Sequence, residues 1–347
     1  MKVLLTGSAG FIGGAVAGQL EDAGDEVVRV DLLIPEAHAA GTPLPPDTHR
    51  VDVRDAGALE PLLQGVDVVC HQSAMVGAGV TVADLPSYAS HNDLGTAVLL
   101  AAMSAAGVGR LVVASSMVVY GEGRYACSQH GDQTPPPRRL EALDGGDFEN
   151  HCALCGRPLT WETVDESARL DPRSSYAASK VATEHYVTAW ARQAPGAAVA
   201  LRYHNVYGPG MPRDTPYSGV AALFRSAIEQ GHPPNVFEDG GQMRDFVHVS
   251  DVARANVLSL RQVVEAPDES FTTYNVCSGE PVPIKRVAEL VVAGTGRDLA
   301  PTVSGRYRLG DVRHIVASPQ KAARELGFTA RVQPTDGLQE FATAPLR

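Results

Sequence analysis

A tyrosine and a lysine near the middle of the chain have the residue types and the spacing for proton transfer. Tyr176 and Lys180 stand four residues apart in the segment SSYAASKVATEH, whose pattern predicts a helix with both side chains on one face. A phenol with a pKa of about 10 is a poor base at neutral pH, but a neighbouring ammonium favours the phenolate. Ser115 and Ser116, at the end of a predicted strand in ASSMVVYG, offer a hydroxyl donor to the same reacting group.

A glycine-rich turn at the start of the chain has the form of a dinucleotide site. Gly7, Gly10 and Gly13 follow a short apolar strand and open a predicted helix, in which Phe11 and Ile12 also belong to the turn. Such glycines allow a tight turn, a close approach of the backbone to a pyrophosphate, and close packing of helix on strand. A glycine-rich turn without a ligand is the alternative interpretation.

Acidic residues after the next two strands bear on the choice of cofactor. Asp31 ends the second strand, 18 residues beyond Gly13, where a carboxylate can bind the adenosine ribose hydroxyls and would repel a 2′-phosphate. We therefore predict NAD rather than NADP. Asp52 and Val53 follow the third strand, where the carboxylate could meet the adenine amino group. Asp52 could equally cap a helix that starts near Arg54.

Five motifs occur in order over about 250 residues, and together they carry a resemblance to a known family. They are TGSAGFIG, ASSMVVYG, SYAASK, LRYHNVYGPG and RDFVHVSDV. The set resembles the NAD-dependent sugar epimerase/dehydratase family of extended short-chain dehydrogenases/reductases. The resemblance implies that Ser116 hydrogen-bonds the sugar hydroxyl or ketone and that Tyr176 is the catalytic base. Lys180 would assist Tyr176 and hold the nicotinamide ribose, and the positive nicotinamide would favour the phenolate further.

The same resemblance implies residues that bind a nucleotide-diphosphate sugar. Asn205 in LRYHNVYGPG matches the position that contacts the sugar diphosphate, and Arg244 matches an arginine near the phosphates. Arg308 and Asp311 in YRLGDVRH resemble a late pair that holds phosphate and nucleotide ribose. Ordinary surface ion pairs are the alternative interpretation for Arg244 and Arg308.

The residues beside Ser116 narrow the reaction. Members of the family that are 4,6-dehydratases resemble one another in carrying Asp-Glu directly after the catalytic hydroxyl residue, whereas Met117 and Val118 stand here and cannot carry a proton. We expect a 4-epimerase acting through a 4-keto intermediate on a dTDP- or UDP-linked hexose or 6-deoxyhexose. A dehydrogenase or 4-ketoreductase, and a dehydratase with a non-standard acid and base, remain alternatives. A non-catalytic NAD-binding regulator is the least favoured.

A polar segment, residues 121–172, replaces what is usually a short connection and holds three of the five cysteines. Cys127 and His130, then Cys152 and Cys155, form two knuckles with the spacing of a small zinc ribbon. Free thiols, a site that has lost its metal, or a disulfide are the alternatives. The segment leaves just before Tyr176, so it could cover the substrate pocket. It also resembles an insertion in bacterial members that act on dTDP-linked 6-deoxysugars.

Alternating apolar strands and helices must position these residues. The strands expected at 3–5, 26–31, 66–71 and 110–115 read as continuous apolar runs, which are typical of a parallel sheet buried on both faces. We predict an α/β fold with a Rossmann-type doubly wound sheet in residues 1–203 and a smaller α/β substrate lobe in residues 204–347. Segments at about 244–262 are expected to return to the first domain.

Composition limits the remaining possibilities. A formal net charge of −11 argues against a nucleic-acid partner, and the absence of a long apolar stretch argues against a membrane span. An odd number of cysteines and no recognisable signal peptide favour a cytoplasmic protein without a disulfide framework. Long Ala-rich helices expected at 92–106 and 175–194 suggest a homodimer, because family members often pair through these helices.

Overall fold

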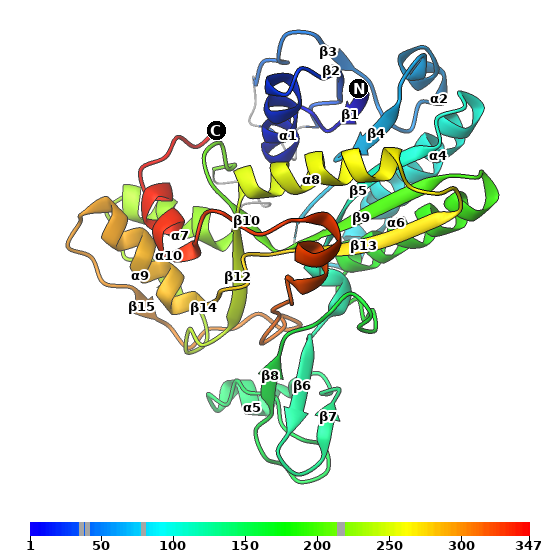
Figure 1. The fold of residues 1–347 in the computed structure, drawn as a ribbon. Coiled ribbons are helices and arrows are strands. Elements are labelled where there is room, and N and C mark those ends of the chain that lie inside the picture. The colour runs from blue at the N-terminus through cyan, green and yellow to red at the C-terminus, as the bar shows by residue number, and fades with distance from the viewer. Residues whose placement is uncertain (35–37, 39–41, 78–80, 214–218) are drawn as a thin grey trace.

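Seven parallel strands form the centre of the larger lobe in the computed structural model (Figure 1). The structure describes residues 1–34, 38, 42–77, 81–213 and 219–347. The strand order is β13-β9-β5-β4-β1-β2-β3. In chain order the strands are β1 (Lys2–Thr6), β2 (Glu26–Asp31), β3 (Thr48–Arg50), β4 (Val68–His71), β5 (Arg110–Ser116), β9 (Ala197–Tyr203) and β13 (Ser270–Val276). The predicted α/β fold with a Rossmann-type sheet is confirmed.

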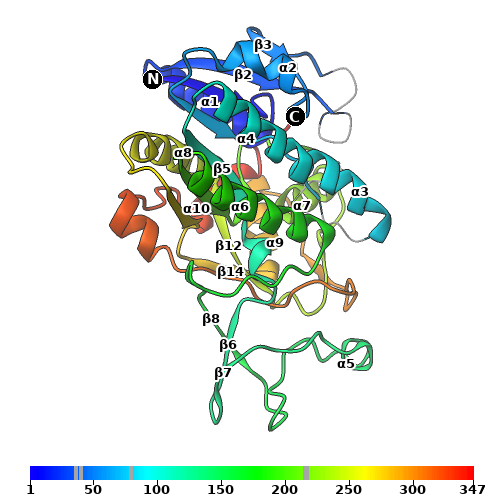
Figure 2. The ribbon, with the colours of Figure 1, turned by 90° about the vertical axis from the view of Figure 1, so that its right-hand side faces the viewer.

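Helices cover both faces of this sheet. α1 (Phe11–Asp22) and α8 (Val249–Val264) lie on one face, and α4 (Gly95–Ala105) and α6 (Ser175–Gln193) lie on the other (Figures 1 and 2). The pleat of β1 divides its side chains accordingly: Val3 and Leu5 enter the core under α1 and α8, whereas Leu4 enters the core under α4 and α6. Burial on both faces explains why these strands are continuous apolar runs.

Short helical segments complete this larger lobe, called here the Rossmann lobe. They are α2 (Ala56–Leu59), α3 (Leu85–Tyr88), 3-10 segments at Glu60–Leu63, Val82–Asp84 and Met117–Tyr120, and π-helical turns at Ala89–Leu94 and Ala322–Leu326. The strand order reverses between β1 and β4. From β1 the chain adds β2 and β3 on one side, and then returns to add β4 on the other side of β1. Ligands of doubly wound sheets bind outside the carboxyl ends of strands at such a point.

The chain after β9 builds a smaller lobe beside the sheet, called here the small lobe (Figure 1). Its strands are β10 (Asn205–Tyr207), β11 (Asn235–Val236), β12 (Met243–His248), β14 (Pro281–Pro283) and β15 (Thr302–Val303), and its helices are α7 (Val220–Glu229), α9 (Ile284–Thr295) and α10 (Pro334–Phe341). Its core gathers residues such as Phe246, Val291 and Leu338. Some elements from this part of the sequence, α8 and β13 among them, pack in the Rossmann lobe instead.

Most of residues 121–172, called here the Cys/His module, project from the body (Figures 1 and 2), whereas Val164 and Leu170 near the end of this range pack on it beside Tyr120. The module holds α5 (Leu140–Asp144) and an antiparallel sheet of β7 (Gly131–Gln133), β6 (Arg124–Cys127) and β8 (Thr160–Glu162) in that order. The predicted Cys-rich insertion and the smaller C-terminal lobe are thus both present. Within the described residues, no helix combines the length and the apolar character required to cross a bilayer.

Candidate active site

The glycine turn between β1 and α1 forms one end of the candidate site. Gly7 has a φ of +69°, and a Cβ there would lie 2.7 Å from the backbone nitrogen of Ser73, so the position excludes a side chain. A Cβ on Gly13 would lie 2.0 Å from the carbonyl oxygen of Gly7, which shows how closely the helix packs on the turn. α1 begins without a side-chain cap, and its N-terminal N–H groups favour an anion at this position.

Asp31 lies beside this turn and braces it. Its buried carboxylate accepts hydrogen bonds from the backbone N–H of Ala9 (2.9 Å) and of Leu33 (2.8 Å). Each carboxylate oxygen keeps a further acceptor position, as a ribose diol requires. The expected acid at the end of the second strand is therefore present and is held in place by the backbone.

Asp52 pairs with a neighbour instead of capping a helix. Its carboxylate accepts bonds from the backbone N–H and the guanidinium of Arg54, and this hydrogen bonding lowers the pKa of Asp52. The cap of α2 is Asp55, whose side chain accepts from the N–H of Ala58. The alternative of Asp52 as a helix cap is therefore wrong, because the helix begins three residues further along.

One cavity of about 340 Å³ joins the glycine turn to Tyr176 and Lys180, and its described lining includes Ser115 but not Ser116. All ten residues predicted to bind the cofactor line it, together with one predicted to bind substrate. They are Gly7, Gly10, Phe11, Ile12, Gly13, Asp31, Asp52, Val53, Tyr176, Lys180 and Asn205. The cavity opens at the carboxyl ends of the central strands, where the strand order reverses. A glycine cradle without side chains, a free helix N-terminus and an acid at Asp31 fit a dinucleotide of the NAD type.

Tyr176 and Lys180 enter the cavity from the first turns of α6. The Nζ atom of Lys180 lies 5.9 Å from the centre of the Tyr176 ring and donates to the carbonyl oxygen of Ala114 (2.9 Å) on β5. Burial raises the pKa of Tyr176 above its ordinary value, and a hydrogen bond with Ser116 lowers it. The phenol therefore needs the ammonium and a further positive charge to act as a base near neutral pH.

The two serines of β5 have different partners. Ser115 is buried and donates to the carboxylate of Glu184 (2.5 Å), so its hydroxyl is used inside the fold. Ser116 ends the strand, is half-buried, and faces Tyr176. Alternation along a strand sends neighbouring side chains to opposite faces, which explains why only one of them reaches the phenol. This arrangement favours Ser116 for the role that the family resemblance implies.

The buried ammonium of Lys180 lowers the free energy of unfolding, and this effect can be measured. Burial lowers the pKa of its ammonium to about 8 from an ordinary 10.5, so the unfolded chain binds more protons between those two pH values. The buried charge therefore destabilises the fold below about pH 8, and the penalty disappears as the pH rises to about 10.5. We expect Lys180→Met to stabilise the nucleotide-free protein at pH 7 by roughly 2 kcal/mol, after allowing for the lost bond to Ala114.

This prediction is checked by the unfolding temperature as a function of pH. The variant should unfold roughly 3 °C above the native protein at pH 7 and at the same temperature or below it near pH 10.5. Lys285→Met, on an exposed position of α9, is the control and should show no such dependence. A variant less stable than the native protein at pH 7 would contradict the assignment of a buried charge.

The residues expected to bind the substrate fall into two groups. Asn205 lines the cavity, and its side-chain oxygen has no hydrogen-bond partner among the described residues. Arg244 lies outside the cavity lining, where its guanidinium donates to the carbonyl oxygens of Val312 (2.7 Å) and Arg313 (2.9 Å). Arg308 packs over the ring of Phe237.

Asp311 belongs to this second group because its carboxylate interacts electrostatically with Arg308 and Arg244. Burial raises the pKa of Asp311, and Arg308 and Arg244 lower it. Arg244, Arg308 and Asp311 thus gather on the small lobe and are not among the lining residues of the cavity, although β12, which carries Arg244, pairs with β10, which carries Asn205. The surface ion pairs considered for the two arginines do not appear among the described residues, since Arg244 binds carbonyl oxygens and Arg308 packs on an aromatic ring.

Acidic groups in the cavity bear on the alternative of a dehydratase. The carboxylates among the described lining residues are Asp31 and Asp52, both at the end of the glycine turn. Met117 and Val118 lie in the 3-10 turn after β5. No carboxylate of the described lining therefore lies near Tyr176. Outside that lining, Asp93 interacts electrostatically with Lys180, and burial raises the pKa of Asp93 to about 6.

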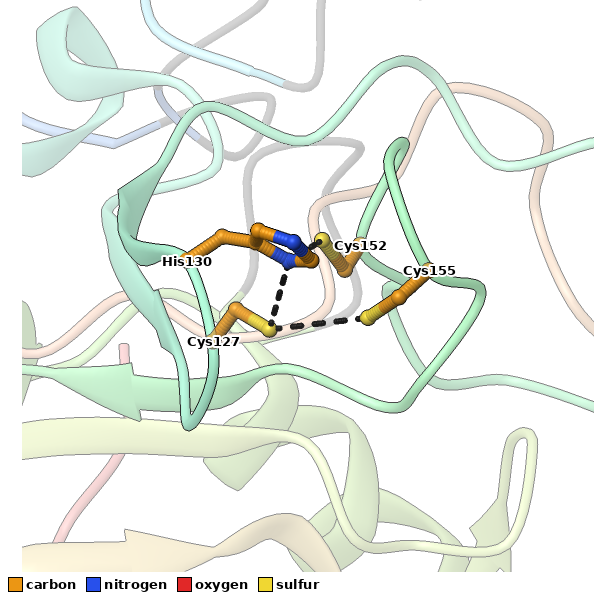
Figure 3. A group of neighbouring side chains, drawn as sticks. All are labelled: Cys127, His130, Cys152 and Cys155. Carbon is orange, nitrogen blue, oxygen red and sulfur yellow. Dashed lines mark hydrogen bonds between the residues drawn. The ribbon is translucent and has the colours of Figure 1, made fainter.

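Four side chains of the Cys/His module converge on one point (Figure 3). The two knuckles are the turn between β6 and β7 and the loop before β8. The Sγ atoms of Cys127 and Cys155 are 3.7 Å apart, and the Nδ1 atom of His130 lies 3.6 Å from Sγ of Cys127 and 3.4 Å from Sγ of Cys152. All five cysteines lie within the described residues and none forms a disulfide.

These separations fit a tetrahedral metal. Zn²⁺ with bonds of about 2.3 Å to sulfur and about 2.0 Å to nitrogen places two sulfurs about 3.8 Å apart and a sulfur about 3.5 Å from a nitrogen. A tetrahedral metal held by these four side chains would have no open position for a substrate.

The module does not cover the cavity, since none of the described lining residues comes from 121–172. It contacts the small lobe instead, through ion pairs of Arg313 with Glu149 (2.5 Å) and of Arg138 with Glu238 (2.9 Å).

Some lining residues gave little signal in the sequence. Gln72, Ser73 and Met75 follow β4 and reach the cavity because that strand flanks the reversal of strand order. The motif CHQSAMVG after a buried strand could have indicated them. Arg347 also lines the cavity, at the opposite end of the sequence from the glycine turn, and no motif marks it.

Comparison with known proteins agrees with this geometry. Residues 3–141 and 153–277 match the family described as the NAD dependent epimerase/dehydratase family, with a gap inside the Cys/His module. A dTDP-L-rhamnose 4-epimerase from Burkholderia thailandensis is 32% identical over 354 aligned residues, which cover 99% of this chain and 94% of that protein.

Solved structures give the same result. UDP-glucose 4-epimerase from Thermotoga maritima, determined with UDP-glucose, superposes with a TM-score of 0.78 at 27% identity and covers 99% of this chain and 97% of that one. UDP-glucose 4-epimerase from Thermus thermophilus, in complex with NAD, has a TM-score of 0.76 at 30% identity, with coverage of 99% and 98%. The resemblance read from five motifs is confirmed over nearly the whole length, and the chain belongs to the NAD-dependent epimerase/dehydratase family.

Proposed function

We propose that the protein is an NAD-dependent nucleotide-sugar 4-epimerase, an isomerase that acts on a dTDP- or UDP-linked hexose or 6-deoxyhexose. One observation carries the proposal: Tyr176 and Lys180 line the same cavity as the glycine turn, and Ser116 lowers the pKa of the Tyr176 phenol by hydrogen bonding. The family membership supports it, as do relatives named 4-epimerases over almost their full length. The similarity to a dTDP-L-rhamnose 4-epimerase favours a dTDP-linked 6-deoxyhexose.

In this mechanism the chain moves one proton and holds the sugar. NAD, when bound at the glycine turn, supplies the acceptor and then the donor of the C4 hydride. Tyr176, as phenolate, takes the proton of the C4 hydroxyl. The 4-keto sugar then turns over in the cavity, and Tyr176 returns the proton to its oxygen as hydride reaches the other face of C4. Lys180 stabilises the phenolate by charge, and Ser116 donates a hydrogen bond to the C4 oxygen.

Substrate binding is assigned to both groups of polar residues. Asn205 has a free side-chain oxygen at the cavity, and Arg244, Arg308 and Asp311 supply charge on the small lobe. Guanidinium groups suit diphosphate oxygens, and a carboxylate suits ribose hydroxyls. A sugar lying between Tyr176 and this group would have its C4 at the phenol and its nucleotide toward the small lobe.

Two other reactions use overlapping residues. A dehydrogenase or 4-ketoreductase needs only one half of the cycle, so Ser116, Tyr176 and Lys180 serve it equally well. A 4,6-dehydratase needs an additional acid and base, which the described lining lacks near Tyr176. A non-catalytic NAD-binding regulator would not require the three residues together. The 4-epimerase therefore accounts for the site with the fewest further assumptions.

Incubation with a panel of dTDP- and UDP-linked hexoses and 6-deoxyhexoses tests the proposal. We expect NMR to show a product inverted at C4, with the same final ratio from either epimer, and no lasting NADH absorbance, because the hydride returns to the sugar. NADH formed in proportion to product would identify a dehydrogenase, and loss of water would identify a dehydratase. Failure of the protein to bind NAD would reject all three.

We also propose that the Cys/His module holds a structural Zn²⁺ through Cys127, His130, Cys152 and Cys155. The separations between ligand atoms support this, as does the small core of the module, which consists of Tyr125, Cys127, Cys152 and Leu159 with Trp161 beside them. A core of this size is too small to keep the segment folded without a further cross-link, which a bound metal would supply. A closed ligand set gives the metal no part in the reaction.

The homodimer stays a prediction. It rests on the helices of one face of the sheet, α4 and α6, which lie side by side in Figure 2. Leu94, which precedes α4, and Tyr186 on α6 are large exposed side chains on this face. An exposed apolar face of this kind suits pairing with a second copy of the chain.

A further inference from the structure

Arg347, at the opposite end of the sequence from the glycine turn, lines the cavity beside that turn. It shares the lining with Gly7, Gly10 and Asp31. Its Nη1 atom donates to the carbonyl oxygen of Ala9 (2.5 Å), a residue of the turn itself. In Figure 1 the chain after α10 runs away from the small lobe and ends near α1. A side chain 338 residues away in sequence thus contacts the turn that opens α1.

Backbone hydrogen bonds hold Arg347 at this position. The main-chain oxygen of Arg347 accepts from the N–H of Arg213 (2.9 Å), and its N–H donates to the carbonyl oxygen of Met211 (3.3 Å). Gly210 donates to the carbonyl oxygen of Pro345 (2.7 Å), which extends the pairing. Leu346 packs against the core of the small lobe. Both backbone groups of Arg347 are therefore engaged, and the guanidinium is directed by a fixed backbone.

Arg347 brings a positive charge to the end of the cavity at the glycine turn. Among the described lining residues, Lys180 and Arg347 are the two side chains with a permanent positive charge, and Lys180 lies beside Tyr176. The carboxylates at the turn are Asp31, which attracts Arg347, and Asp52, which is paired with Arg54. His38 also lies here, 3.7 Å from Asp31, and burial lowers its pKa, which favours the neutral ring. Without Arg347, this end of the cavity would therefore carry a net negative charge, which opposes a ligand with two phosphate charges.

We propose that Arg347 binds the diphosphate of the dinucleotide, opposite the N-terminus of α1. The inference rests on the proposed function, since it concerns the NAD that this function requires. The helix N-terminus offers N–H groups, and Arg347 adds a full positive charge with several donors, of which one contacts Ala9. Since the segment around Arg347 pairs with residues 210–213 and packs on the small lobe, it also ties the dinucleotide to that lobe.

Binding of three adenosine ligands separates a phosphate contact from a structural role. Titration calorimetry on nucleotide-free protein would compare NAD⁺, ADP-ribose and adenosine with native protein, Arg347→Gln and Arg347→Lys. We expect Arg347→Gln to raise the Kd of NAD⁺ and of ADP-ribose by about tenfold or more and to leave adenosine unchanged, because adenosine has no phosphate. Arg347→Lys should fall between, and the difference should shrink at high salt.

Arg213→Gln is the matched control. Arg213 belongs to the same pair of segments, but its guanidinium is exposed and pairs with Glu229 (2.9 Å), and the substitution keeps the main-chain bonds to Arg347. It should leave all three Kd values unchanged.

Three results would overturn the inference: an unchanged Kd for NAD⁺ in Arg347→Gln, an equal loss for adenosine, or a loss confined to NADP⁺, which would place Arg347 at a 2′-phosphate. Native protein that binds no NAD⁺ would reject the proposed function instead.

Discussion

Tyr176→Phe is expected to lower kcat for epimerisation by about a thousandfold while NAD still binds with nearly its normal Kd. The substitution removes the single oxygen that can take the C4 proton and keeps the ring that packs in the cavity. Because the ring of Tyr88 lies 5.9 Å from that of Tyr176, the phenylalanine remains supported by its neighbour. The loss should therefore appear in kcat rather than in KM or in the unfolding temperature.

Tyr186→Phe is the matched control, since Tyr186 lies on the same helix and is 47% exposed. It should keep the native kcat. Steady-state kinetics with the sugar identified by the substrate panel, and calorimetry with NAD⁺, measure the two effects. Turnover of Tyr176→Phe within a few fold of the native rate would exclude the phenol as the base and would leave Ser116 or a residue of another segment to explain the proton transfer.

Cys152→Ser is expected to remove the metal and loosen the Cys/His module. A serine hydroxyl is a poor zinc ligand, and loss of one thiolate from a closed set leaves three ligands and a small apolar core. We expect zinc content to fall from about one per chain to nearly none, and the unfolding temperature to fall by roughly 5 °C. Proteases should then cut within residues 121–172, which the native protein protects.

Because the module contacts the small lobe, Cys152→Ser is also expected to weaken binding of the nucleotide sugar. Arg313 is 1% exposed and pairs with Glu149 of the module as well as Glu238 and Asp239 of the small lobe. A loosened module withdraws Glu149 and disturbs the segment that carries Arg308 and Asp311. KM for the nucleotide sugar should therefore rise several fold, whereas kcat and the Kd of NAD⁺ should change little.

Leu154→Ala is the control for a substitution in the same loop that removes no candidate ligand, because Leu154 lies between Cys152 and Cys155 and is 71% exposed. It should keep zinc, stability and KM. Elemental analysis of native protein prepared under reducing conditions with zinc supplied gives the direct check. Protein without bound zinc under those conditions would end the metal proposal, and the four residues would then be free thiols with a neighbouring histidine.

The strands of the sheet could be read from the sequence wherever burial on both faces demanded it. The strand expected at 26–31 has those bounds in the structure, and the one expected at 110–115 extends by one residue to Ser116. β13 was not predicted because Ser270–Val276 lacks the continuous apolar run by which the other strands were found, although its Thr, Phe and Tyr residues favour a strand. It lies at the edge of the sheet, where one neighbouring strand is missing and the apolar run is weaker.

Candidate site residues could also be proposed from the sequence, but their grouping in space could not. Local spacing indicates that Tyr176 and Lys180 share a helix face and that three glycines form one turn. Whether Arg244, Arg308 and Asp311 would meet Asn205 at one cavity depends on how two lobes pack. None of the three lines the cavity with Asn205, although Arg244 lies on β12, the strand paired with that of Asn205, and binds backbone carbonyl oxygens of residues 312 and 313.

The sequence by itself determined the fold class, the glycine turn and the spacing of Tyr176 and Lys180, and it indicated the four Cys and His residues that converge in the module. Each is encoded within a few residues, since glycine, charge and periodicity act locally. Tertiary structure alone decided that the module contacts the small lobe instead of the cavity, and that Arg347 lies at the glycine turn. These contacts join segments up to 338 residues apart, and they depend on packing between lobes that no local pattern specifies.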